Sequence, residues 1–165
     1  MVKKEIPYID YDGNKQTCTA YFNMNRTECI DLDMEFEDEG GLMGHLKALL
    51  PLLKQQENAK KKPLVDFVKM MVEKSYGVRP KSNPSLFMKE DDDGHRLVHK
   101  FKASPAYDEF VFRLMTGEES LNDFMEKILP EVPEADIAAA KVKMKEEGFD
   151  FGEENDASAN NDTRH

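Results

Sequence analysis

Apolar residues recur at helical spacing in three stretches of the chain. Each stretch places large apolar side chains at positions i, i+3, i+4 and i+7, the period of a helix with one buried face. The stretches are Leu64, Phe67, Val68 and Met71; Tyr107, Phe110, Val111 and Leu114; and Leu121, Phe124, Met125 and Ile128. This pattern predicts three amphipathic helices.

Capping residues set the expected ends of these helices. Pro63 suits a first helical position, and Gly77 suits the residue that follows a helix. Ser104-Pro105 supplies an N-cap and a first residue for the second helix, and Thr116-Gly117-Glu118-Glu119 matches a capping box for the third. Pro130 should end that third helix.

Two further helices are expected earlier in the chain. Asn25-Arg26-Thr27-Glu28 matches a capping box, and its helix should run to Met34 or Phe36. Leucines on one side of residues 42–57 predict a second helix, which Pro51 should kink or break. Residues 78–94 have loop composition, and residues 96–100 suit either an extended or a helical segment.

Residues 4–23 have the pattern of a β-hairpin. Asp12-Gly13 supplies the turn, and the return run Thr17–Phe22 is rich in β-branched and aromatic residues. Pro7 lacks an N–H, so the first strand should be an edge strand. A lone hairpin is marginal in water and must pack on other elements.

These elements predict a mainly α fold of the α+β kind, with the hairpin packed on a bundle of five or six helices. We expect one domain over residues 1–130 and an additional Ala-rich helix over residues 131–148. Residues 149–165 combine low hydrophobicity with high charge, which predicts a disordered acidic tail.

Composition narrows the classes of function. The formal net charge is −10, and seven acids against Arg164 give the last 20 residues −6, so the acidity is expected chiefly in the tail. The basic run Lys60-Lys61-Lys62 is expected to be a solvated linker, which leaves no nucleic-acid surface. No segment resembles a signal peptide or a membrane span, and the cysteines form no CxxC pair, so we expect a soluble, cytoplasmic protein with reduced thiols.

The sequence contains no complete motif for a catalytic or metal-binding site. An EF-hand with Gly94 at loop position 6 would begin at Lys89 and end at Lys100, where carboxylates are needed. His95 and His99 lack the following Glu of the HExxH motif, and the phosphate-binding, dinucleotide-binding and esterase motifs are absent. The acidic run should be a surface turn, and we expect no metal, no cofactor and no catalysis. A Cys–His pair stays open, with nothing to favour it.

Methionine is frequent, with ten residues, whereas Trp is absent. Met70 and Met115 lie beside the main stripes of their helices, and Phe112 lies well off its stripe. Two interpretations are open: helices buried on two sides, or an exposed groove that binds an apolar helix. The candidate partner-binding residues are Met70, Met71, Phe110, Phe112 and Met115.

Several segments, in order and spacing, resemble the tail assembly chaperones of siphophages and related prophages from Gram-positive hosts. Together with the hairpin, these segments span about residues 4–130. The last of them is the most specific. These segments are Tyr21–Glu28, Glu39–Leu42, Lys74–Arg79, Asp93–Val98, and Ser104–Thr116 with Phe124 and Ile128–Pro130. The chain departs from the family by a longer loop at 80–92 and by about 35 residues after Pro130.

The resemblance implies a non-enzymatic, largely helical protein that is absent from the finished tail. Its implied partners are the apolar, helical tape measure protein and, further, tail tube subunits; self-association is open, and no nucleic acid or membrane is implied. Such chaperones are often made in two lengths by ribosomal frameshifting. The alternatives are a structural tail-completion or connector component of the virion, an acidic mimic of nucleic acid, and a small enzyme.

Overall fold

The expected hairpin is present at the N-terminus of the computed structural model, which describes residues 1–130. Strand β1 (Val2–Ile9) pairs antiparallel with β2 (Lys15–Phe22), from Val2 opposite Phe22 to Ile9 opposite Lys15. A short strand, β3 (Tyr76–Gly77), adds to the other side of β2, so β1 is an edge strand as Pro7 predicts. The Asp10 carboxylate accepts backbone N–H groups of Asp12 and Asn14 at the turn.

Six α-helices follow the hairpin within residues 1–130, which confirms the predicted fold class. They are α1 (Arg26–Glu35), α2 (Gly41–Leu49), α3 (Asn58–Ser75), α4 (Val98–Lys102), α5 (Pro105–Thr116) and α6 (Leu121–Ile128). Two short 3-10 helices, η1 (Glu37–Glu39) and η2 (Leu50–Lys54), flank α2, and η2 carries the break expected at Pro51. The helix predicted over 131–148 and the tail predicted over 149–165 lie outside the described residues.

The predicted start of α3 is wrong. This helix begins at Asn58, so Pro63 lies inside it and Lys60-Lys61-Lys62 belongs to the helix rather than to a linker. Lys60 pairs with Glu57 at 3.1 Å and Lys62 pairs with Asp66 at 2.9 Å. In each pair the two residues lie about one helical turn apart. Acids at this spacing balance the charge of lysines on the helix surface.

Helix α3 ends at Ser75, directly before Tyr76 and Gly77, as predicted, but two predicted capping roles are wrong. Gly77 has no positive φ and lies in β3, where an added Cβ would stand 2.5 Å from the Phe87 ring. Its small size is therefore needed for a close approach, not for a helix end. The N-cap of α6 is Ser120, whose hydroxyl accepts the Asp123 N–H, whereas Gly117 ends α5 with a φ of 83°.

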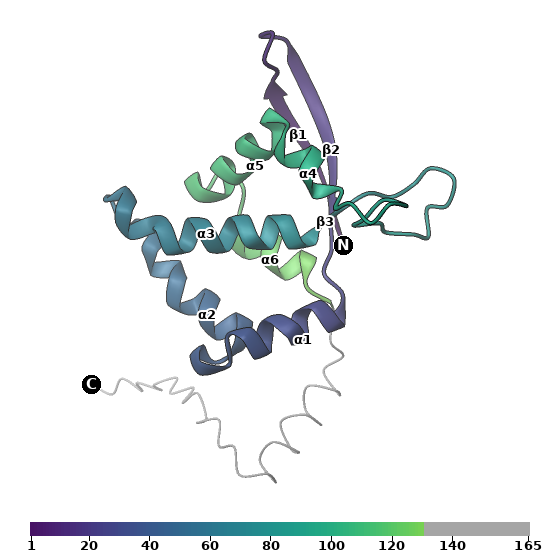
Figure 1. Cartoon of the computed structure of the whole chain (residues 1–165). Helices are drawn as coiled ribbons and strands as arrows, with labels where there is room; N and C mark the ends of the chain where they lie inside the picture. The colour runs from purple at the N-terminus through teal and green to yellow at the C-terminus, as the bar shows by residue number, and fades with distance from the viewer. Residues whose placement is uncertain (131–165) are drawn as a thin grey trace, which may run out of the picture. The chain divides into compact units, whose positions relative to one another are not determined.

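The core is built around the Phe22 ring, at the end of β2 nearest the helices. This ring stacks on Phe110 at a centroid distance of 5.0 Å and meets Phe124 edge-on at 5.3 Å. The adjoining backbone is fixed by a hydrogen bond of 2.8 Å from the Met24 N–H to the Ile128 carbonyl. The turn end of the hairpin extends past the helices beside α5, while α1 and α2 lie at the opposite end of the described part (Figure 1).

No helix within residues 1–130 has the length and apolar character needed to cross a membrane.

Candidate partner-binding surfaces

The five residues predicted to bind a partner separate into buried and accessible ones. Met71 and Phe110 have 0% and 1% of their surface exposed, because they lie on the stripes of α3 and α5 that face the core. In this structure a partner cannot touch these two side chains directly. Met70 and Met115 are half-buried against the core, and Phe112 is 58% exposed. The exposure of Phe112 follows from its position off the apolar stripe.

A groove of about 570 Å³ lies between the hairpin and α5. Its walls come from Pro7–Ile9, Lys15–Thr17, Glu109 and Arg113. The Arg113 Nε donates a hydrogen bond to Glu109 Oε1 at 2.8 Å. The two opposite charges that α5 contributes to the groove are therefore already paired with one another. The groove therefore offers a surface of mixed polar and apolar side chains.

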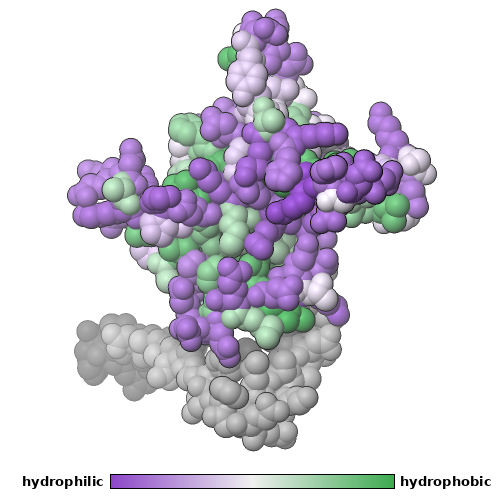
Figure 2. Space-filling model, in the orientation of Figure 1, coloured by the Kyte–Doolittle hydropathy of each residue, from purple (hydrophilic) through white to green (hydrophobic). Residues whose placement is uncertain are grey.

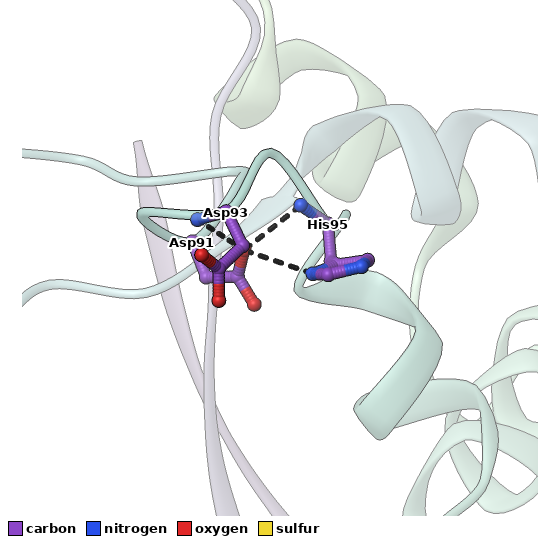
Figure 3. A group of neighbouring side chains, drawn as sticks. All are labelled: Asp91, Asp93 and His95. Carbon is purple, nitrogen blue, oxygen red and sulfur yellow. Dashed lines mark hydrogen bonds and ion pairs between the residues drawn. The ribbon is translucent and has the colours of Figure 1, made fainter.

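The acidic run before Gly94 forms the predicted surface turn. Potential metal ligand atoms of Asp91, Asp93 and His95 all lie within 4.8 Å of one another. One oxygen of Asp91 accepts the backbone N–H of His95 at 2.8 Å and that of Asp93 at 3.1 Å (Figure 3). The hydrogen bond from the His95 N–H is the main cause that lowers the pKa of Asp91. These bonds explain the clustering without a cation.

Both cysteines are half-buried free thiols. Burial raises the pKa of Cys18 and of Cys29, with smaller contributions from nearby carboxylates. A thiol with a raised pKa is a weak nucleophile, because the thiolate is the reactive form. Their surroundings fit small apolar side chains at the edge of the core.

The surface that sequence patterns missed lies on α1 and α2. Ile30 and Met34 are 56% and 70% exposed, one turn apart on α1, and Met43 of α2 is 47% exposed. The two helices are tied together because the Asp33 carboxylate accepts the Leu42 N–H at 2.8 Å. Figure 2 shows apolar residues exposed in the region of α1, on the visible face.

Negative charge gathers around these apolar side chains. Residues 26–39 hold seven carboxylates and one Arg, a formal charge of −6, whereas all of residues 1–130 carry only −4 from 23 carboxylates and 19 Lys and Arg. Glu28 pairs with Lys89, and Glu39 pairs with His45. Within the described residues the other five form no ion pair: Asp31, Asp33, Glu35, Glu37 and Asp38. The count of the last 20 residues predicted that the acidity would lie chiefly in the tail. Residues 26–39 form a second acidic segment outside it.

Comparison with known proteins identifies a protein family. The model of a family described as phage tail assembly chaperone matches residues 1–164. Neither the curated proteins nor the solved structures contain a match.

Proposed function

Because the chain belongs to the phage tail assembly chaperone family, we propose that it binds the tape measure protein of its phage during tail assembly. The family match over residues 1–164 is the observation that carries this proposal. We further propose that the chain assists the assembly of tail tube subunits, acts in the host cytoplasm as a non-enzymatic protein and is absent from the finished virion.

Exposed apolar side chains on helices support a protein partner. Ile30, Met34 and Phe112 are each more than half exposed. Water-exposed apolar side chains grouped on helices fit the apolar face of another helix, the usual mode of helix-in-groove recognition. A tape measure protein, being long and helical, is expected to offer such faces repeatedly.

Co-expression with the tape measure protein of the same phage tests the proposal. The tape measure protein should co-purify with the tagged chain and should precipitate when expressed alone. Mass spectrometry of purified virions should detect tape measure protein and no peptide of this chain. The chain at stoichiometric level in virions, with no capture of tape measure protein, would instead identify a structural tail-completion or connector component.

A further inference from the structure

We propose that the α1–α2 surface binds an amphipathic helix whose apolar stripe is bordered by Lys and Arg. We define this surface by Ile30, Met34 and Met43 together with the carboxylates Asp31, Glu35, Glu37 and Asp38. The inference rests on the proposed function, because it names the chemistry of the partner segment and the face that receives it.

The apolar part of this surface faces away from the core. At about 100° per residue, Ile30 and Met34 lie roughly 160° from Leu32, the one fully buried side chain of α1. A helix that covers the core with one face normally has polar residues on the opposite face. Two large apolar side chains spaced i, i+4 there present the ridge that a partner helix can pack against.

The charged part selects the kind of helix. Asp31 and Glu35 are each one residue from an apolar member of the pair, and Glu37 and Asp38 follow in η1. None of these four carboxylates has an ion-pair partner within residues 1–130. Lys and Arg beside the apolar stripe of a partner would therefore meet unpaired negative charge, which favours both fast association and correct orientation.

The same charge disfavours two other occupants. A second copy of this chain would bring its own α1–η1 segment, with a charge of −6, against an equal charge. Residues 149–165, the predicted acidic tail, carry five carboxylates against Arg164, so this segment too is negative. Like charges brought together at an interface oppose binding.

Three synthetic helical peptides provide the test, with binding to the full chain followed by fluorescence anisotropy. The first peptide has a leucine stripe bordered by Lys, the second replaces Lys by Glu, and the third keeps Lys but replaces the leucines by Ser. We expect the first peptide to bind at least about tenfold more tightly than the others, and less tightly at high salt.

Two pairs of variants locate the binding face. Ile30→Ser with Met34→Ser should lower affinity for the first peptide by about tenfold or more, and Asp31→Lys with Glu35→Lys should transfer the preference to the Glu peptide. Leu86→Ser and Glu126→Lys are matched controls, exposed residues outside this surface, and should leave affinity unchanged. Phe112→Ser tests the candidate residue on α5 separately. Circular dichroism would verify that each variant is folded.

Several outcomes would overturn the inference. Equal binding of the Lys and Glu peptides would refute the charge argument, and loss of binding only in Phe112→Ser would place the site on α5. A change in sedimentation of the α1 variants, without a change in peptide binding, would assign the face to self-association. Greater proteolysis of residues 131–165 in those variants, again with unchanged peptide binding, would assign it to the chain's own C-terminal segment. Specific peptide binding combined with no capture of tape measure protein would sustain the surface and reject the proposed function.

Discussion

Replacing Phe22 by Ala should remove a large part of the stability of residues 1–130. The Phe22 side chain is fully buried, and its ring contacts Phe110, Phe124, Phe101 and Tyr76 at centroid distances of 5.0, 5.3, 6.0 and 5.9 Å. Burial of such a ring contributes about 1.5–3 kcal/mol, and each well-oriented aromatic pair adds about 0.5–1.5 kcal/mol. These contributions are not additive, so we take the whole effect typical of replacing a buried Phe by Ala, about 3–5 kcal/mol including the cavity, as the expected loss.

Urea unfolding followed by circular dichroism would measure this loss. A domain of this size has a free energy of unfolding of about 5–15 kcal/mol, so the Phe22→Ala protein should stay folded at low temperature. Its melting temperature should fall by roughly 10–20 °C. The matched control is Phe112→Ala, whose ring is 58% exposed and should contribute less than about 0.5 kcal/mol. If both variants lose the same free energy at an unchanged m-value, Phe22 is not the centre of the core.

Three other predictions concern stability. Gly77→Ala should cost about 1–3 kcal/mol in urea unfolding, because the new Cβ would stand 2.5 Å from the Phe87 ring; no loss would mean that the ring moves aside freely. Ser120→Ala should lower the free energy of unfolding by about 0.5–2 kcal/mol and Thr116→Ala by much less, since Ser120 caps α6. A larger loss for Thr116→Ala than for Ser120→Ala would mean that Thr116 is the cap. Burial, and then the hydrogen bond to a neighbouring carboxylate, raises the pKa of Tyr107 above its ordinary 10.0. The folded state therefore holds this proton more tightly, and stability should fall as the pH rises past 10. Tyr107→Phe should lessen that fall, and equal pH profiles would contradict the assignment.

Local chemistry explains the successful sequence predictions. The capping box of Asn25 and Glu28 and the Ser104-Pro105 start of α5 depend only on neighbouring residues, and the structure has both. The hairpin was equally predictable, because its turn residue lies within a few residues of both strands. That residue is Gly13, which adopts a φ of 85°. Such features need no knowledge of tertiary packing.

The wrong predictions depend on distant or competing partners. The role of Gly77 is set by Phe87, ten residues away in a loop that sequence patterns leave undefined. Thr116 and Ser120 are both acceptable caps by composition, and the left-handed Gly117 that ends α5 decides between them. In each case the local pattern was compatible with two structures, and packing selected one.

The α1–α2 surface shows a similar limit. Helix α1 has apolar residues on both faces, so spacing alone does not say whether Leu32 or the pair Ile30 and Met34 faces the core. The accumulation of acids over residues 26–39 was visible in the sequence but was overlooked beside the equal negative charge of the last 20 residues. The structure adds that Ile30 and Met34, which lie among these acids in the sequence, are exposed.

The hydrogen bond between Met24 and Ile128 has a consequence for the order in which the chain folds. It joins residues 104 positions apart in sequence, and contacts of such long separation form late because a long loop must close first. The hairpin can form early from neighbouring residues, but the start of α1 is anchored only after α6 has been made. A nascent chain should therefore gain its acidic helix face in final position only after Ile128 has left the ribosome, and partner binding to that face should follow this point.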